Sequence, residues 1–363
     1  MERIKYSVII PTLNQSQKLT QCLEHLALLS YDPSEFEVLV IDNGSTDDTQ
    51  GVTESYQGRI RNLHCHYCAE PGLMAARHMG CDEANGEILC YLDDDSMVTE
   101  GWLRGMEESF HRDDVVIAGG PCIPKYEEPP PEWVENFWVL TDYGKVNTFL
   151  SLVDFGEDFR MIPPYYIFGC NYAIRKQILL EYGGTQPDYY PEKYRAYQGT
   201  GESALAQKLH RNGFFAAYNP RARIDHLIPS SRLTLKYFCW RRYFNGIHSS
   251  YQDVRRQHGL DGYVGPDDAP GASSGLSVRK IVQAVRRPLG RAKHRVAGFL
   301  RKGGFFAAAA QEDPPEIAAI RRIIDENYKA GYAFHQQALK NDLRLRKWVL
   351  RPDYLGENGK LPR

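Results

Sequence analysis

The first hundred residues alternate between short apolar runs and stretches with helical spacing. The apolar runs are rich in β-branched and aliphatic residues, as buried strands are. The longest stretch between them carries leucines at helical intervals, which predicts an amphipathic helix. Alternation of this kind predicts an α/β fold with a mostly parallel, doubly wound sheet and right-handed crossovers. The expected strands are 6–10, 36–41, 64–68 and 88–92, and the expected helices are 16–29, about 47–56 and 72–84.

Polar clusters follow three of these strands, at 11–14 (PTLN), 42–45 (DNGS) and 93–95 (DDD). In an open parallel sheet, ligands bind just beyond the carboxyl ends of the strands, so we expect the three clusters to face one crevice. Asp, Asn, Ser and Thr also form helix N-caps and turns, and for Ser45 and Thr46 that interpretation is equally well supported. It suits the acidic triplet less well, because like charges packed together repel unless something positive lies among them.

The Asp93-Asp94-Asp95 triplet is the strongest candidate for chemistry. On an extended segment, Asp93 and Asp95 point to one side and Asp94 to the other. Carboxylate oxygens at the mouth of a sheet suit Mg²⁺ or Mn²⁺, which keeps waters and takes substrate phosphates as its remaining ligands. Such a cation neutralises charge on a departing diphosphate. The alternative interpretation is a solvated acidic turn.

Composition limits the classes to which the chain can belong. With 363 residues, 42% of them hydrophobic and 25% charged, it is long enough for one large domain plus an appendage. A formal net charge of −2 argues against a general nucleic-acid binder. The apolar run at 6–10 is too short for a signal peptide or a membrane span. We therefore expect a cytoplasmic protein that is at most peripheral at the inner face of the membrane.

Eight cysteines are scattered along the chain and are typical of free thiols. Cys65 and Cys68 form one C-x-x-C motif, flanked by His64 and His66, which leaves a zinc site as a minor alternative. A structural zinc site needs four ligands and usually a second matching pair, and none follows at a suitable spacing. The alternating pattern favours a strand instead.

Four motifs, each beside its own strand, carry a resemblance to a known family. SVIIPTLN, VLVIDNGSTDDT, EPGLMAARHMG and YLDDDS occur in this order in the first hundred residues. In these motifs the chain resembles glycosyltransferase family two, whose members have the GT-A fold, and the resemblance extends over roughly residues 5–230. It implies an inverting transferase that depends on Mn²⁺ or Mg²⁺. Such an enzyme moves a sugar from a nucleotide sugar, with UDP as the preferred carrier, to an acceptor hydroxyl.

The resemblance also implies roles for individual residues. Asp42 matches the carboxylate that recognises the base, Asp93 resembles the ribose-side carboxylate, and Asp95 resembles the metal ligand. His78 stands where the family commonly has Asn. The residues implied in nucleotide-sugar binding are Pro11, Thr12 and Asn14 beside the nucleoside, Asp42, Asn43 and Ser45 at the base, Gly72, Ala76 and Arg77 near the base and diphosphate, and Asp93 and Asp94 on the donor.

A base is needed for the acceptor hydroxyl, because an alcohol is a poor nucleophile until its proton is removed. The segment GTGESALAQKL at 199–209 resembles the Glu-Asp element that opens a helix in the family, with the Asp replaced. Setting Leu205 on the family's leucine places Glu202 at the base position. The alternative is an acidic residue in a first helical turn, where the helix dipole favours it.

Three further elements resemble parts of the family's site. Gly169, Asn171 and Arg175 resemble the stretch under the acceptor and donor sugar, although a core strand with a basic end is equally well supported. His226 resembles a late His that completes the metal shell in some relatives, but a lone His after a strand is more often structural. Trp240-Arg241-Arg242 either contacts the diphosphate or forms a charged helix face.

The chain is expected to divide into a catalytic domain at 1–235 and a helical C-terminal extension at 236–363. Within the first, we expect a nucleotide-binding half at 1–98 and an acceptor-binding half at 99–235. A stretch rich in Gly, Pro, Asp and Ser at 263–276 is typical of a flexible linker or loop.

Residues 279–302 contain nine Lys or Arg residues and no acid. A basic amphipathic stretch can lie on an anionic membrane surface, which would suit a lipid-linked acceptor. A solvated helix that lies against the acidic catalytic domain is the other interpretation.

Two other enzyme classes would need sequence motifs that this chain does not have after its first strand. A sugar-phosphate nucleotidyltransferase would need a Gly-rich, basic loop after the first strand, where this chain has PTLNQS. A Rossmann dehydrogenase would need a G-x-G-x-x-G at the same place. A non-catalytic member that binds a nucleotide sugar or a partner protein stays open, because Glu202-Ser203 departs from the family pattern. The expected partners are a nucleotide sugar and a saccharide, lipid-linked or small-molecule acceptor, in polysaccharide, glycolipid or other glycan biosynthesis, with no nucleic acid.

Overall fold

The computed structural model describes residues 4–260 and 313–362. The predicted linker at 263–276 and the basic segment at 279–302 lie outside the described residues. No helix in the described ranges is long and apolar enough to cross a membrane.

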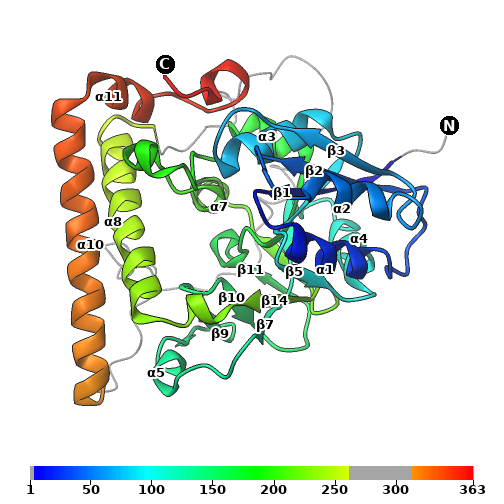
Figure 1. Ribbon diagram of the computed structural model, residues 1–363, viewed down its shortest axis with the longest axis horizontal. Helices are drawn as coiled ribbons and strands as arrows, with labels where there is room; N and C mark the ends of the chain where they lie inside the picture. Colours follow the sequence, from blue (N-terminus) through cyan, green and yellow to red (C-terminus); the bar gives the residue numbers. More distant parts are fainter. Residues whose placement is uncertain (1–3, 261–312, 363) are drawn as a thin grey trace.

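The centre of the fold is an eight-stranded mixed sheet, whose helices and strands alternate in its first half as predicted (Figure 1). Parallel pairing joins its middle strands, and the helices between them are the predicted crossovers. In spatial order the strands are β11 (Arg160–Ile162), β13 (Ala216–Tyr218), β6 (Ile117–Gly119), β12 (Asn171–Arg175), β4 (Ile88–Leu92), β1 (Tyr6–Thr12), β2 (Phe36–Asp42) and β3 (Leu63–Tyr67). The helices beside it are α1 (Ser16–Leu26), α2 (Thr49–Tyr56), α3 (Leu73–Glu83), α4 (Trp102–Phe110), α6 (Lys176–Glu181) and α7 (Glu202–Arg211).

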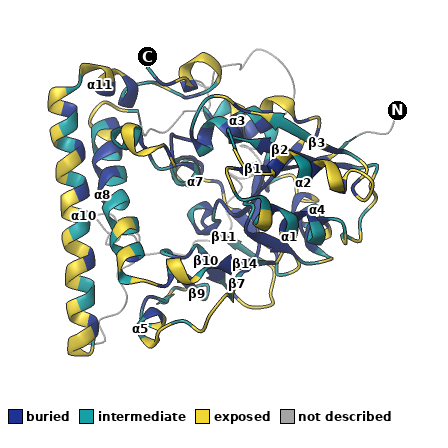
Figure 2. Ribbon diagram, in the orientation of Figure 1, coloured by how far each residue is buried: buried dark blue, intermediate teal, exposed yellow. Residues whose placement is uncertain are grey.

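The middle strands are buried on both faces, which explains their continuous apolar sequence. Val8, Ile9, Val38 and Val40 are completely buried, and Figure 2 shows β1 and β2 among helices α1, α2 and α3. Two strands depart from the predicted parallel arrangement. Strand β12 runs antiparallel to both β4 and β6, and β11 runs antiparallel to β13.

A second, six-stranded sheet was not predicted from the sequence. Its strands contain two to five residues, which is too short to leave a recognisable period. Five of its six strands derive from 96–154, and the sixth returns from 224–228 to pair in parallel with β7. In order the strands are β5 (Ser96–Val98), β14 (Ile224–Ile228), β7 (Cys122–Tyr126), β10 (Leu152–Asp154), β9 (Lys145–Asn147) and β8 (Val139–Leu140), and α5 (Glu132–Glu135) lies between β7 and β8.

Two C-terminal helices run parallel to one another on one side of the two sheets (Figure 1). Helix α8 (Leu235–Gln257) packs along α10 (Pro315–Asn341), and α11 (Leu343–Val349) follows. The pair is fixed to the rest of the molecule by Phe238 and Ile324 at one end and by Trp348 and Tyr354 at the other. The extension therefore packs against the part of the chain that forms the two sheets.

Two glycines set the distance between α8 and α10. An added Cβ on Gly246 would collide with the carbonyl oxygen of Tyr328, and one on Gly331 would collide with the carbonyl oxygen of Tyr243. Both glycines are buried within their helices. Since glycine costs about 1 kcal/mol relative to alanine in a helix, close backbone approach is what favours it here.

The substitution Gly331→Ala tests this packing. Helix propensity alone would stabilise the variant by about 1 kcal/mol, but overpacking a close contact costs about 1–3 kcal/mol. We expect a lower free energy of unfolding in urea denaturation. The control is Ala330→Ser, which also adds one heavy atom but on the exposed side of α10. A Gly331→Ala variant that is more stable than the wild type would refute the close contact.

Candidate active site

The polar clusters after β1 and β2 lie side by side, as predicted from the parallel pairing. Thr12 pairs with Asp42 in the register of the two strands. Beyond them, the backbone N–H of Asn14 donates to Oγ of Ser45 (2.9 Å), and Oδ1 of Asn14 accepts from the N–H of Thr46 (2.7 Å). Asn14 has a φ of 53°, which places its exposed side chain across the second loop. The two loops are therefore fixed to one another.

Asn43 fixes a third loop to the same edge of the sheet. Its Nδ2 donates to the carbonyl oxygens of Cys68 (3.1 Å) and Glu70 (2.7 Å), and its Oδ1 accepts from the N–H of Gly72 (2.9 Å). Gly72 precedes α3 with a φ of 109°, and an added Cβ there would collide with the ring of Tyr190. Asn43 and Gly72 thus shape the site through the backbone.

The acidic triplet forms a turn between β4 and β5. Oδ2 of Asp94 accepts a hydrogen bond from the Thr12 hydroxyl (2.7 Å). Burial, with the nearby charge of Asp95, raises the pKa of Asp94 to about 8. The Asp93 side chain remains 34% exposed, and burial raises its pKa too, against the opposing effect of Arg77.

Asp95 is almost fully buried and contacts two residues from the second sheet. The register of β14 against β5 pairs His226 with Ser96, which brings the imidazole to the acidic turn. Nε2 of His226 lies 3.2 Å from Oδ1 of Asp95, and Nη2 of Arg232 lies 2.8 Å from Oδ2. Burial acts to raise the pKa of Asp95, but His226 and Arg232 together hold it well below its ordinary value.

Asp95 and His226 fit the requirements of a divalent cation. Cis ligands at about 2.1 Å from an octahedral ion are about 3.0 Å apart, close to the 3.2 Å between Oδ1 and Nε2. Oδ1 of Asp95 is buried and meets no hydrogen-bond donor besides His226 within the described chain. The described residues supply no third His, Cys, Asp or Glu to this pair. Mg²⁺ and Mn²⁺ commonly complete their shells with water and substrate phosphates.

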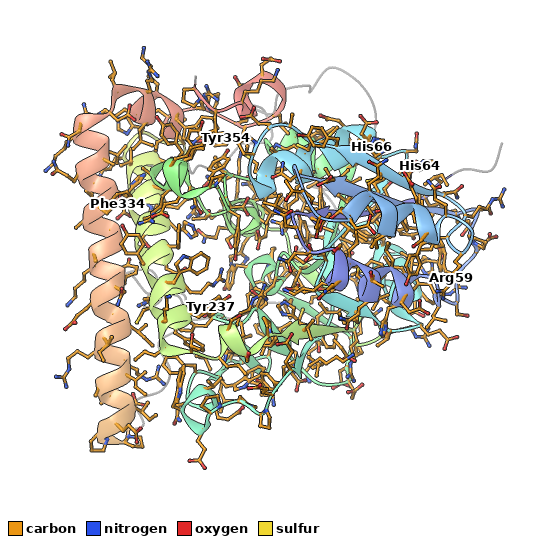
Figure 3. All side chains as sticks on the ribbon, in the orientation of Figure 1. Arg59, His64, His66, Tyr237, Phe334 and Tyr354 are labelled. Atoms are coloured by element: carbon orange, nitrogen blue, oxygen red, sulfur yellow. The ribbon has the colours of Figure 1, made fainter. Side chains whose placement is uncertain are left out.

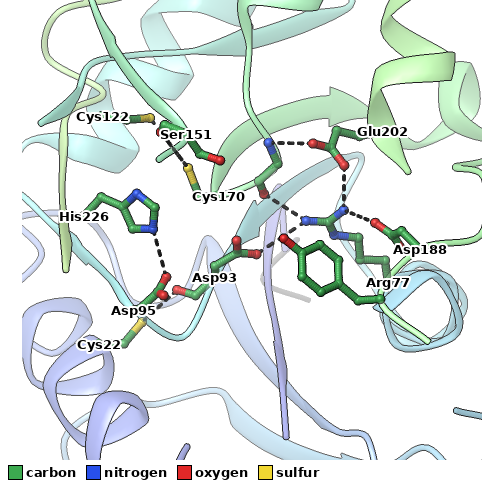
Figure 4. Close-up of polar contacts among 12 residues, drawn as sticks. Cys22, Arg77, Asp93, Asp95, Cys122, Ser151, Cys170, Asp188, Glu202 and His226 are labelled. Carbon is green, nitrogen blue, oxygen red and sulfur yellow. Dashed lines mark hydrogen bonds and ion pairs between the residues drawn. The ribbon is translucent and has the colours of Figure 1, made fainter. Parts of the chain in front are cut away.

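Arg77 lies at the centre of the site, on α3, with only 2% of its side chain exposed (Figure 4). Burial disfavours its charge, but Glu202 and Asp188 raise its pKa well above the ordinary value. The guanidinium contacts Oε2 of Glu202 (2.9 Å), Oδ2 of Asp188 (3.5 Å), Oδ1 of Asp93 (3.4 Å) and the carbonyl oxygen of Gly169 (3.2 Å).

Glu202 is the first residue of α7, as the sequence pattern indicated. Oε1 of Glu202 accepts from the N–H of Gly169 (3.1 Å), and Oε2 accepts from Arg77. An added Cβ on Gly169 would lie 2.6 Å from Nη2 of Arg77 and 2.7 Å from Oε1 of Glu202. Glycine is therefore required at 169 for these side chains to meet.

Two predicted sugar-side residues are not brought to this cluster. Because β12 is antiparallel to β4, Arg175 pairs with Ile88 at the opposite end of the sheet from Asp93. Its guanidinium donates to backbone carbonyls of Val115 and Phe110. Arg175 thus lies outside this cluster, as the alternative interpretation of a core strand with a basic end expects.

The side chains of Asn171 and Ala76 lie in the interior of the fold. The Asn171 side chain is buried, accepts from Nε1 of Trp102 (2.8 Å) and donates to the carbonyl oxygen of Ala222 (2.9 Å). Ala76 and Pro11 are buried beneath the donor-side loops. His78, in place of the family's Asn, accepts from the N–H of Thr185 (3.0 Å), and burial lowers its pKa to about 4.

Sequence reasoning missed two residues of the cluster. Asp188 lies in QPDYYP, where no pattern distinguishes it, yet it is buried against Arg77. Burial raises the pKa of Asp188 to about 7, although Arg77 opposes the shift. Arg232 follows His226 by six residues in DHLIPSSR, and a basic residue shortly after the candidate metal ligand was the available signal.

The chain is similar in sequence to known glycosyltransferases. Residues 7–182 match glycosyl transferase family 2. Glycosyltransferase AglE of Haloferax volcanii is 34% identical over 115 residues, which are 31% of this chain and 38% of AglE. The glucosyl-dolichyl phosphate glucuronosyltransferase of the same organism is 23% identical, and the match covers 69% of this chain and 78% of that protein.

Among solved structures, the mannosyltransferase PcManGT from Pyrobaculum calidifontis, in complex with GDP-Man and Mn²⁺, is similar in fold. The two chains superpose with a TM-score of 0.50 at 16% identity, over 96% of this chain and 84% of PcManGT. The match to AglE spans about two fifths of that relative's length. The chain therefore belongs to glycosyl transferase family 2 through residues 7–182, and it has a GT-A-like fold.

Proposed function

We propose that the chain transfers a sugar from a nucleotide sugar, with UDP as the preferred carrier, to an acceptor hydroxyl with inversion. One observation carries this proposal: Arg77 binds Glu202 through Nη1 (2.9 Å) and Asp93 through Nη2 (3.4 Å). The candidate base and the donor-side carboxylate therefore border one space. Solvent reaches both, since their side chains are 23% and 34% exposed.

The proposed reaction is a single displacement. The acceptor oxygen bonds to the anomeric carbon while the bond from that carbon to the diphosphate breaks. Glu202 takes the acceptor's proton, and the nucleoside diphosphate leaves with the bonding electrons. Because attack and departure occur on opposite faces, the configuration inverts. Positioned general bases contribute about 10²–10⁴-fold to such reactions.

The nucleoside would lie beyond β1 and β2. Pro11, Thr12, Asn14, Asp42, Asn43 and Ser45 are proposed to border it, with Gly72, Ala76, Asp93 and Asp94 completing the donor side. The hydrogen bonds among these loops support the proposal, because they preorganise the binding surface before a ligand arrives.

Asp95 and His226 are proposed to hold Mn²⁺ or Mg²⁺. When bound, the cation would supply positive charge that offsets the charge of the leaving diphosphate. The near-octahedral spacing of the two ligand atoms and the Mn²⁺ in the PcManGT complex support this assignment.

The acceptor is inferred to be a glycan or a lipid-linked saccharide in glycan biosynthesis. Support comes from the relative whose name gives a glucosyl-dolichyl phosphate as its substrate. Contact of 279–302 with an anionic membrane surface, at the inner face of the membrane, stays a prediction.

The substitution Glu202→Gln tests the base. It keeps the size of the side chain but cannot take a proton, so kcat for transfer should fall by about 10²–10⁴. Donor affinity, measured by calorimetry, should change less than about twofold, because Glu202 would act on the acceptor. The control is Glu316→Gln, at an exposed position in the first turn of α10. Transfer at the wild-type rate in Glu202→Gln would rule out this role.

Metal dependence is tested by donor hydrolysis across a panel of nucleotide sugars with Mn²⁺, Mg²⁺ or EDTA. We expect release of one nucleoside diphosphate that requires the divalent ion. In Asp95→Ala the rate should fall at least about a hundredfold, because metal ions contribute several kcal/mol to such steps. Asp158→Ala, an 81% exposed position, is the control.

Two outcomes of the donor panel would contradict the proposal. Release that is unaffected by EDTA and by Asp95→Ala would refute the metal assignment. Binding of a nucleotide sugar without turnover, with every acceptor mixture, would favour the non-catalytic alternative.

The pH dependence of stability tests the Arg77 cluster. Since burial raises the folded-state pKa of Asp188 to about 7, the folded protein holds one extra proton between about pH 4 and pH 7. The free energy of unfolding should therefore decrease as pH rises through this window, by up to about 1.4 kcal/mol per pH unit for this group. Asp188→Asn should remove that slope in urea denaturation. An identical slope in wild type and variant would contradict the buried acid.

A further inference from the structure

A row of aromatic side chains lies along α8 near the acidic cluster. Tyr237, Trp240 and Phe244 are three and four residues apart, so the helix places them above one another. The rings of Tyr237 and Trp240 stack, with centroids 5.8 Å apart and planes inclined by 25°, and Phe244 follows at 4.7 Å. Figure 3 labels Tyr237 on the part of α8 beside the catalytic sheets.

Tyr189 joins this row from the loop before the short helix at 192–197. Its φ is 49°, a left-handed conformation that a bulky residue rarely adopts. The neighbours Asp188 and Tyr190 are both buried, so the strained turn anchors the backbone on either side and leaves Tyr189 53% exposed. Its ring centroid is 6.4 Å from that of Trp240. Strain of this kind is concentrated at functional sites.

Two arginines connect the aromatic row to the carboxylates. Nη1 of Arg241 donates to the Tyr189 hydroxyl (2.7 Å). Burial opposes the charge of Arg241, but Tyr189 and, more weakly, Glu202 raise its pKa. Arg232, in the turn just before α8, binds Oδ2 of Asp95 at 2.8 Å. Tyr237 follows Arg232 by five residues, so the row begins close to the candidate metal ligand.

The exposure of these rings is not explained by packing. Trp240 is 43% exposed and Tyr189 is 53% exposed, although both contact other aromatic rings. Clustered exposed aromatics on a soluble protein mark a binding surface more often than single ones do. The core already contains Phe238 on the opposite side of the same helix turn, so folding does not require Trp240.

We propose that Tyr189, Tyr237 and Trp240 form a platform on which a pyranose ring of the acceptor stacks. The inference rests on the proposed function, in which an acceptor hydroxyl must reach Glu202. A pyranose has a face of C–H bonds that matches the negative face of an aromatic ring, and a rim of hydroxyls. The hydroxyls would meet the Arg241 guanidinium and the Tyr189 hydroxyl, which lie at the edge of the rings.

This combination selects a saccharide over the other ligands that aromatic rings accept. An alkyl chain would gain from burial, but it would cover the polar Arg241–Tyr189 pair without offering it any hydrogen bond. A nucleobase would stack equally well, but the loops assigned to the nucleoside follow β1 and β2 instead. The platform thus belongs to the acceptor side of the site.

The test measures binding of n-octyl β-D-glucopyranoside to the full chain by ligand-observed NMR, below its micelle concentration. Tetraethylene glycol mono-octyl ether has the same alkyl chain without a sugar and serves as the comparison ligand. We expect the glucoside to bind and the ether to bind at least about fivefold more weakly. In Trp240→Ala, the Kd for the glucoside should rise by about two- to twelvefold, the loss expected for one aromatic contact.

Two further variants complete the test. Trp240→Phe keeps an aromatic ring, should fold as the wild type does, and should show an intermediate Kd. Phe215→Ala removes another exposed aromatic, 41% accessible and outside the platform, and should leave the Kd unchanged.

The proposal is overturned if the wild type does not bind the glucoside, if the ether binds as tightly, or if Trp240→Ala binds the glucoside unchanged. Failure of the proposed function would be seen separately, as absence of nucleoside diphosphate release by the wild type with every donor. Glucoside binding needs no turnover, so the two failures are distinguishable.

Discussion

Arg77 carries an almost completely buried charge, and the candidate active site is built around it. A guanidinium in the interior is costly unless it is paired and its donors are bonded. Here Asp93 and Glu202 supply the opposite charge, and Asp188 and the carbonyl of Gly169 accept further hydrogen bonds. Each partner comes from a different segment, so the cost of burial is offset only when all of those segments are in place.

The Arg77 network therefore links folding to the geometry of the site. Breaking a buried pair by removing one partner typically costs about 3–5 kcal/mol, because the remaining charges stay buried and unpaired. Glu202 is held through Nη1 and Asp93 through Nη2 of one planar group. The distance between candidate base and donor-side carboxylate is thus set by the width of the guanidinium, which lysine would not reproduce.

The sequence predicted the donor side of the site more fully than the acceptor side. The strands through 92 are continuous and apolar, and three of them end in a polar cluster. The parallel pairing of these strands and the edge of the sheet at which the site lies could therefore both be predicted. After Asp95 the strands shorten to a few residues, and the direction of β12 could not be inferred. Arg175, at the far end of β12 from the acidic turn, therefore could not be placed from the sequence. Asp188 and Tyr189 lie in an irregular loop, where contacts depend on tertiary structure and leave no period in the sequence.

The charge balance explains why both the candidate cation site and the second sheet matter to the proposed chemistry. The cluster contains five acids, of which Asp94 and Asp188 have pKa values raised to about 8 and about 7 by burial. Two buried or half-buried guanidinium groups, Arg77 and Arg232, face them.

A nucleoside diphosphate would bring further negative charge into this region, and like charges at short range repel strongly in a partly buried site. The second sheet brings basic side chains to this region, because β14 and the turn after it place His226 and Arg232 against Asp95. Under the proposed function, the first sheet thus positions the donor-side carboxylates, and the second sheet supplies the positive charge that the diphosphate needs.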